Sequence, residues 1–312
     1  MTVCAIITCS GDIASAQACL HHLMQQTRKP DCTILTTNRH VQSGDQEKLL
    51  SDYASIGLII SVTDTAAEWD TCFRLAFEQH GASHIWLLDP QCAPAPHSLE
   101  NLLGKATVSK QIPVSLMLVP YRENELSMPV FVENGGNLFA PWKSIQHREA
   151  LPTSKQISLR GAWWGALYPR EVYTQLGTPK SSLTLNGGNE EYAWQTKLAG
   201  FQFTLVKDSV IRHPFIPRHL IHYKIGGRSF FYECGLPPEL RYCKIRNWAW
   251  IQRLRKPGKP LLRLLFCGLY IILALNAMLK CGEFRPQLIY DLFRALHNGF
   301  YGKLRPYSGR KN

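Results

Sequence analysis

Short apolar, β-branched runs alternate with helical patterns along the first 120 residues, and this alternation constrains the fold more than any other feature of the sequence. The strand-like runs lie at 3–8, 32–37, 57–62, 84–88 and 114–119. Helical patterns lie between them at 13–26, 66–80 and 94–106. Repeated strand–helix–strand units predict an α/β fold with a mostly parallel sheet and helices on both of its faces.

Polar residues follow four of these predicted strands. In open α/β sheets the ligand lies beyond the carboxyl ends of the strands, so these residues are the first to consider as a site. They are Thr8–Ser10, Thr36–Arg39, Thr63–Asp64 and Asp89–Gln91. No Gly-x-Gly-x-x-Gly follows the first strand and the sequence has no Gly-x-x-x-x-Gly-Lys-Ser/Thr, which disfavours a dinucleotide site and a P-loop.

Residues 122–160 show no such alternation. Pro129, Gly135-Gly136, Pro141 and Pro152 interrupt the segment. Because proline and glycine break regular elements, we expect a mobile, loop-rich crossover close to the site.

Positive charge is concentrated in the last third of the chain. The 312 residues include 35 Lys and Arg and 23 Asp and Glu, a formal net charge of +12. Residues 1–211 hold 16 basic and 19 acidic side chains, whereas residues 212–312 hold 19 and 4, so the two parts carry −3 and +15. Such an imbalance predicts an anionic partner for the last third, either nucleic acid or a phosphate-rich membrane surface.

An apolar run within that third favours the membrane. Leu261–Leu279 is almost entirely apolar apart from Arg263 and Asn276, and the preceding Arg253–Lys259 supplies four cations. Pro286–Phe300 places apolar residues on one helical face. We predict a membrane-surface hairpin, because the run is short for a spanning helix and contains an arginine. A spanning helix and a buried core helix are the alternatives. Nucleic acid is disfavoured because an apolar run does not fit a phosphate groove.

The ten cysteines form no Cys-x-x-Cys pair, which indicates neither a zinc site nor a disulfide scaffold. The amino terminus lacks the charged lead and apolar core of a secretory signal and is typical of a first buried strand. We therefore expect the protein to reside in a reducing cytosol.

Three motifs follow one another in a characteristic order. They are a strand ending in Asp89-Pro-Gln91, a turn and helix that carry Glu190-Glu191-Tyr192, and a strand ending at His213. With the Gly161–Val172 stretch, Arg246-Asn247 and Asn298–Gly302, they make the chain resemble family 2 glycosyltransferases of the GT-A fold. Within that family, the chain most resembles the bacterial rhamnosyl- and galactofuranosyltransferases of surface polysaccharide synthesis. The resemblance implies a GT-A domain over residues 1–225, a nucleotide-sugar-binding mixed sheet between helices, and a helical membrane-association region over residues 226–312.

The resemblance also implies a divalent cation, Mg²⁺ or Mn²⁺, which neutralises the departing diphosphate. Asp89 and His213 match the ligand positions of the family. Gln91 stands where the family has a second carboxylate, and an amide oxygen carries no charge, so we expect weaker cation binding. The alternative for His213 is a strand-end histidine hydrogen-bonded to backbone.

Transfer also needs a base for the acceptor hydroxyl, since that hydroxyl loses its proton as it attacks the anomeric carbon. The family pattern aligns Glu191-Tyr192 with its final pair and leaves Asn189 where its usual base carboxylate stands. We favour Glu190 as the base and Glu191 as a group that grips acceptor hydroxyls. The alternatives are that Glu191 itself is the base, or that both acids only complement the helix amino terminus.

Further contacts follow from the same resemblance. Thr8, Asn38 and Asp64 are predicted to bind the nucleotide sugar together with Asp89 and Gln91, although Asn38 and Asp64 are also common turn formers. For the acceptor we predict a stacking floor, and the alternative is an aromatic core. The acceptor residues are Trp163, Trp164 and Tyr192.

Together these features predict an inverting glycosyltransferase at the cytoplasmic face of a bacterial inner membrane. It would move one sugar from a UDP- or dTDP-sugar to a lipid-linked or polysaccharide acceptor of lipopolysaccharide O-antigen or capsule synthesis. The Gln-x-x-Arg-Trp motif of processive synthases is absent from the sequence, which favours a single addition. The alternative is a catalytically silent relative that binds a glycan or a partner protein, because Gln91 and Asn189 stand where carboxylates are expected.

Overall fold

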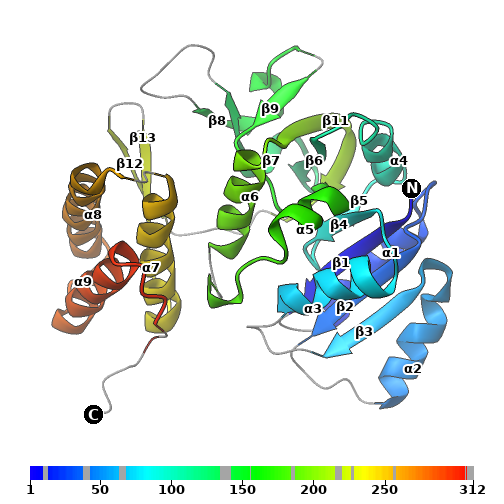
Figure 1. Cartoon of the computed structure of the whole chain (residues 1–312), viewed down its shortest axis with the longest axis horizontal. Helices are drawn as coiled ribbons and strands as arrows, with labels where there is room; N and C mark the ends of the chain where they lie inside the picture. Colours follow the sequence, from blue (N-terminus) through cyan, green and yellow to red (C-terminus); the bar gives the residue numbers. More distant parts are fainter. Residues whose placement is uncertain are drawn as a thin grey trace. The chain divides into compact units, whose positions relative to one another are not determined.

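The structure is a computed structural model that describes the whole chain except residues 10–12, 38–42, 63–67, 134–141, 155, 184–186, 215–219, 226–227, 256–257, 306 and 308–312. The chain divides into two compact units (Figure 1). The sheet unit comprises Met1–Gly136, Pro141–Ser181 and Tyr192–Ile216. The C-terminal unit comprises Asn137–Ala140, Ser182–Glu191 and Pro217–Asn312.

A five-stranded sheet forms the first half of the sheet unit. Its order is β10-β4-β1-β2-β3, with β10 antiparallel and the other strands parallel. The chain adds β2 and β3 on one side of β1 and then places β4 on the other side, so the order reverses between β1 and β4. The predicted strands are confirmed as β1 (Val3–Cys9), β2 (Cys32–Thr37), β3 (Leu58–Val62) and β4 (His84–Leu88), joined by β10 (Leu167–Pro169).

Helices cover both faces of this sheet, as predicted (Figure 1). Alternate side chains of β1 enter two different apolar clusters, because successive strand residues point to opposite faces. Ile7 packs in the cluster that contains residues of α1 (Ile13–Met24), α2 (Ser43–Asp52) and α4 (Ser98–Leu103). Ile6 packs in the cluster of α3 (Glu68–Arg74), its π-helical continuation Leu75–Gln79, α5 (Arg170–Leu176) and α6 (Gly188–Leu198). Each fully buried side chain of this size contributes roughly 1.5–3 kcal/mol.

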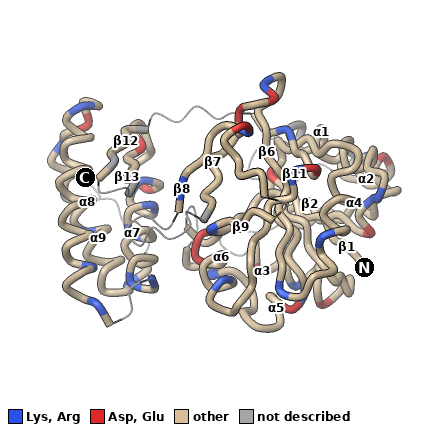
Figure 2. Tube along the Cα trace, turned by 90° about the horizontal axis from the view of Figure 1, so that it is seen from above, with Lys and Arg blue, Asp and Glu red and all other residues tan. Residues whose placement is uncertain are grey.

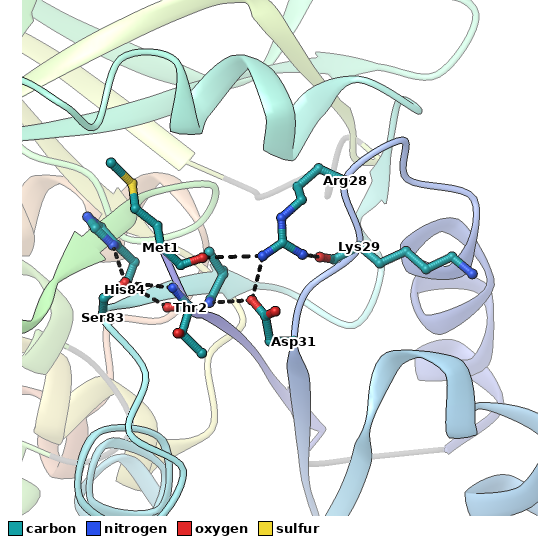
Figure 3. A network of polar contacts seen from close by, with 8 residues as sticks. Met1, Thr2, Arg28, Lys29, Asp31, Ser83 and His84 are labelled. Atoms are coloured by element: carbon teal, nitrogen blue, oxygen red, sulfur yellow. Dashed lines mark hydrogen bonds and ion pairs between the residues drawn. The ribbon is translucent and has the colours of Figure 1, made fainter.

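The amino-terminal edge of this sheet is tied by a polar network (Figure 3). Asp31 accepts a hydrogen bond from the backbone N–H of Val3 at 2.8 Å and pairs with Arg28 at 2.7 Å. Ser83 accepts from the N–H of Thr2 at 2.9 Å and lies 3.0 Å from Nδ1 of His84. These contacts hold together the amino-terminal ends of β1 and β4. The candidate site residues follow the opposite, carboxyl ends of the strands.

A second sheet completes the sheet unit, and it differs from the predicted parallel arrangement. Its order is β5-β11-β6-β7-β8, with β9 pairing β11 and β7. Strands β6 and β11 are parallel and the remaining pairs are antiparallel, because a short connection such as that between β6 and β7 joins only antiparallel neighbours. The strands are β5 (Ala93–Pro94), β6 (Gln111–Val119), β7 (Arg122–Glu133), β8 (Trp142–His147), β9 (Ile157–Leu159) and β11 (Gln202–Arg212).

The expectation of a loop-rich crossover over residues 122–160 is wrong, since β7, β8 and β9 lie there. Pro129 is tolerated because the register between β7 and β8 shifts between Glu125 and Val130, where a missing backbone N–H breaks no regular ladder. Gly135-Gly136 and Pro141 lie outside the described residues. Three 3₁₀ turns, Ala54–Ile56, Arg148–Ala150 and Ser181–Leu183, link other elements.

In the described part of the C-terminal unit that follows residue 219, a hairpin precedes three helices. Strands β12 (Leu220–Ile225) and β13 (Arg228–Glu233) pair in antiparallel fashion. Helices α7 (Pro238–Arg255), α8 (Pro260–Lys280) and α9 (Pro286–Phe300) follow, each beginning at a proline, which suits a first helical turn. The last two match the helical segments predicted from the apolar patterns.

Two motifs quoted for the family resemblance lie where α7 and α9 meet. A Cβ added to Gly299 would lie 2.2 Å from the carbonyl oxygen of Arg246, so only glycine permits this approach. Asn298 donates a hydrogen bond to the hydroxyl of Tyr242 at 2.6 Å. The motifs Arg246-Asn247 and Asn298–Gly302 therefore contribute directly to the packing of this unit.

One disulfide links Cys234, after β13, to Cys281 at the end of α8. The spacing of the cysteines gave no signal for it, because the two residues are 47 positions apart and belong to no recognisable pair.

Candidate functional site

Asp89 and His213 are brought together from different sheets. Asp89 follows β4 of the five-stranded sheet and His213 follows β11 of the second sheet. Nε2 of His213 lies 3.2 Å from Oδ1 of Asp89. The histidine side chain is 1% exposed and the aspartate side chain is 22% exposed, so the carboxylate opens toward solvent while the imidazole is enclosed.

The imidazole of His213 has unused hydrogen-bonding capacity. Despite the short distance to Asp89, neither of its ring nitrogens makes an aligned hydrogen bond with any residue that the structure describes. An unsatisfied polar group in the interior costs about 1–3 kcal/mol, so the arrangement fits a bound group that both side chains would contact.

A divalent cation is consistent with this pair of donors. Carboxylate oxygens suit Mg²⁺ and Mn²⁺, and a neutral imidazole nitrogen is a common metal ligand. Among the described residues, no group of three or more His, Cys, Asp or Glu is arranged to hold a metal ion by itself. The two side chains would therefore leave most coordination positions to phosphate oxygens and water, as is usual for cations that bridge nucleotide phosphates.

The turn after β4 orients the Asp89 carboxylate. The backbone N–H of Gln91 donates to Oδ1 of Asp89 at 2.9 Å, and the N–H of Cys92 donates to its carbonyl oxygen at 2.9 Å. This is an Asx-type turn. Gln91 itself is exposed. Burial raises the pKa of the nearby Cys19 and Cys92 thiols, and the charge of Asp89 adds to that rise, so both thiols stay protonated and do not compete as ligands.

The ends of β1 and β2 supply further polar groups. Thr8 is half-buried and pairs in register with Thr36 of the neighbouring strand. The Thr36 hydroxyl donates to Oε1 of Glu68 at 2.8 Å, while burial raises the pKa of the Glu68 carboxyl. Sequence reasoning missed Glu68, although its place soon after the third strand was a usable signal. The predicted contacts Asn38 and Asp64 lie outside the described residues.

The predicted acceptor residues lie in or beside an aromatic cluster. Trp163 is 6% exposed and Tyr192 is 2% exposed. Trp163 stacks on Phe73, and the hydroxyl of Tyr192 donates to the carbonyl oxygen of Gly177 at 2.9 Å. Trp164 is half-buried, with its ring centroid 5.7 Å from that of Trp69. Of the three predicted residues, Trp164 offers the most accessible ring.

The acidic pair at the start of α6 belongs to the C-terminal unit. The side chain of Glu190 is 49% exposed, and its Oε1 lies 2.6 Å from Nη2 of Arg255. Glu191 is 2% exposed. The side-chain oxygen of Asn189 accepts a hydrogen bond from the N–H of Glu190 at 2.8 Å. Glu190 is therefore the more accessible carboxylate, and Arg255 is a partner that sequence reasoning missed.

Solved structures of S. aureus TarS share this fold. A crystal structure of TarS 1–349 in complex with UDP-GlcNAc has a TM-score of 0.52 at 10% identity, covering 96% of this chain and 80% of that one. The complex of TarS 1–349 with UDP gives 0.50 at 10% identity, with coverages of 97% and 88%.

A longer TarS chain gives a TM-score of 0.49 at 9% identity, and the match covers 82% of this chain but 40% of that one. No protein-family model matches the sequence, and no curated protein matches it. The likeness to TarS 1–349 confirms the α/β fold.

Proposed function

We propose that this protein is an inverting glycosyltransferase that moves one sugar from a nucleotide-sugar donor to a glycan acceptor. The observation that carries the proposal is the Asp89–His213 pair, which lies beyond the carboxyl end of β4 with unused imidazole nitrogens. The reversal of strand order between β1 and β4 is where α/β sheets bind nucleotides. The TarS structures with the same fold hold UDP and UDP-GlcNAc.

Asp89 and His213 would hold a divalent cation, Mg²⁺ or Mn²⁺, on the donor diphosphate. When bound, such a cation stabilises the negative charge that develops on the departing diphosphate. Thr8, Asn38, Asp64 and Gln91 would contact the rest of the donor.

Glu190 would act as the general base. In an inverting transfer the acceptor oxygen forms the new bond to the anomeric carbon as the bond from that carbon to the diphosphate oxygen breaks, and the acceptor proton passes to a carboxylate. Glu190 is exposed enough to meet an acceptor, whereas Glu191 is enclosed. Glu191 would help to fix the acceptor, and Trp164 would offer a ring for a sugar to stack on.

A lipid-linked acceptor at the cytoplasmic face of a bacterial inner membrane fits the C-terminal unit. Helix α8 is long and apolar enough, by length and composition, to cross a membrane, and 22% of its most apolar window is buried. Leu261, Leu265 and Ile272 are 80%, 67% and 66% exposed, on one side of the helix. Basic residues recur on the helices of this unit (Figure 2). An exposed apolar face flanked by cations suits an anionic lipid surface, and a glycan of O-antigen or capsule synthesis would be presented there.

A thermal-shift screen of UDP-, dTDP- and GDP-sugars, each with and without Mn²⁺, tests the proposal. A bound donor stabilises the folded state by RT ln(1 + [L]/Kd), or about 2.7 kcal/mol at a hundred times Kd. We expect one nucleotide class to raise the Tm, and to do so more strongly with Mn²⁺. A flat response to all three classes would contradict a donor site.

A catalytically silent relative is the second candidate. Gln91 and Asn189 favour it, because each stands where the family has a carboxylate. Donor turnover with Mg²⁺ or Mn²⁺ distinguishes the two candidate functions. An active transferase consumes a nucleotide sugar, whereas a silent relative binds acceptor glycan but turns over no nucleotide sugar.

A further inference from the structure

One face of α7 contacts the segment that leads into α6. Asn247, Ile251 and Arg255 are spaced by four residues, which places them above one another on the same side of a helix. A Cβ added to Gly187 would lie 3.1 Å from Cβ of Asn247 and 3.4 Å from Cδ1 of Ile251. Gly187 has a φ of 96°, which favours glycine. The backbone before α6 thus rests directly on α7.

Neighbouring residues of α7 secure the start of the same segment. Nη2 of Arg246 donates to the carbonyl oxygen of Ser182 at 3.2 Å, and the Arg246 side chain is almost fully buried. Leu183 packs with Trp250 and Ile251 in a small apolar cluster. Successive turns of α7 therefore contact Ser182, Leu183 and Gly187, all within the C-terminal unit.

Arg255 ends this row of contacts at Glu190. Its side chain is 14% exposed, and its Nη2 lies 2.6 Å from Oε1 of Glu190. Arginine keeps its charge at all working pH values, and its planar fork fixes the direction of a hydrogen bond. A carboxylate has two oxygens and about four lone pairs, so an ion pair at one oxygen does not by itself prevent proton transfer to the group.

We propose that Arg255 is a positioning residue that holds the Glu190 carboxylate in the geometry required for deprotonating the acceptor. The inference rests on the proposed function and deepens it. Helix α7, in the region predicted to serve membrane association, would then also set the catalytic rate.

The test compares Arg255→Gln with Arg253→Gln. Both variants remove one cation from the last turn of α7, so both change attraction to an anionic surface equally. Arg253 lies beside Gly302 instead of Glu190. We expect Arg255→Gln to lower kcat by about 10- to 100-fold, the effect of losing one charge-assisted hydrogen bond, with little change in the donor KM. Arg253→Gln should stay within about twofold, and Arg255→Lys should recover part of the loss because it restores the charge without the fork.

A double-mutant cycle distinguishes positioning from general structural support. In a Glu190→Gln background, Arg255→Gln should cause no further loss of single-turnover rate, because the carboxylate that it positions is already gone. An equal loss in both backgrounds would overturn the proposal, as would an Arg255→Gln variant as active as Arg253→Gln.

Hydrogen–deuterium exchange gives a readout that does not depend on activity. The amides of residues 187–191 should exchange faster in Arg255→Gln than in Arg253→Gln, and unchanged exchange there would also overturn the positioning role. If the unaltered protein transfers no sugar while these amides respond as expected, the proposed function fails and the contact between α7 and Glu190 stands.

Discussion

The sheet unit and the C-terminal unit place their apolar side chains differently. Of the seventeen large apolar side chains that are exposed among the described residues, twelve belong to the C-terminal unit, which is the smaller one. The buried aromatic residues of the sheet unit lie in two clusters on either side of β1. The first unit thus encloses its apolar side chains more completely than the second, which leaves an apolar surface exposed on α8.

Each unit also has one candidate carboxylate beside a basic side chain, and the two basic partners differ in chemistry. Asp89 in the sheet unit faces His213, a side chain able to bind a metal when neutral. Glu190 in the C-terminal unit faces Arg255, which carries a permanent charge and binds no metal. The first pair suits shared coordination of a ligand, and the second suits fixed orientation of one carboxylate.

The largest expected effect concerns the C-terminal pair. Replacing Glu190 with Gln removes the proposed base, and we expect kcat to fall by about 10²- to 10⁴-fold with the donor KM nearly unchanged. Steady-state transfer assays would measure this. Glu191→Gln is the matched comparison and should lower activity less, mainly through the acceptor KM. A larger kcat loss in Glu191→Gln would reverse the two roles.

The aromatic cluster tests the enclosed core of the sheet unit. Trp163→Ala should destabilise the protein by about 3–5 kcal/mol, because it removes a buried indole from a packed cluster. Trp164→Ala should cost less stability and should raise the acceptor KM instead. Urea unfolding and acceptor titrations would report the two effects. Equal stability losses, with acceptor KM unchanged in both variants, would assign Trp164 to the core.

The exposed apolar surface of α8 supplies the next contrast. Changing Leu261, Leu265 and Ile272 together to Ser should reduce binding to anionic vesicles by roughly tenfold or more, given the transfer free energy of such side chains.

The matched control changes three exposed apolar residues of the sheet unit to Ser. These residues are Val108, Tyr121 and Leu198. Vesicle co-sedimentation should be unaffected in the control, and high salt should release part of the unaltered protein because it screens the cations. The same loss in both triple variants would remove the distinction between the units.

The smallest expected effect lies at the opposite end of β4 from Asp89. Burial lowers the pKa of His84, so the folded state favours the neutral imidazole. Below the ordinary histidine pKa of about 6.5 the unfolded chain binds this proton more readily, and stability falls as the pH drops. Urea unfolding at pH 7.5 and 5.5 should show a weaker pH dependence in His84→Gln than in the unaltered protein. His80→Gln, at an exposed position, is the matched control.

The sequence predicts the elements whose pattern reflects a simple core. Strands β1 to β4, α8 and α9 follow from apolar runs and periodicity, whereas β10, which completes their sheet, carries no such signal. Helix α7 was not predicted, because its buried face includes polar side chains, among them Arg246, Asn247 and Gln252. The sequence of α7 therefore lacks the apolar periodicity of an amphipathic helix. Strands β7 to β9 were not predicted, because a proline such as Pro129 normally indicates a loop. In the structure Pro129 lies at a register shift, where a strand tolerates it.

Some residues of the candidate site were likewise predictable from the sequence, and others were not. Asp89 and His213 follow strands, which made them visible in the sequence, and the structure places them side by side. Arg255 lies 65 residues from Glu190, in a helix rich in arginine, so no local pattern marks it as a partner. Ion pairs of this kind depend on how helices pack, which spacing along a sequence does not encode.

The most direct test of the account is calorimetric titration of UDP into the protein with and without Mn²⁺, repeated with Asp89→Asn and His213→Ala. We predict that Mn²⁺ tightens UDP binding to the unaltered protein by at least about tenfold, and that each substitution removes this gain while leaving metal-free binding nearly unchanged. UDP affinity that responds neither to Mn²⁺ nor to either substitution would contradict a nucleotide-sugar site at Asp89 and His213.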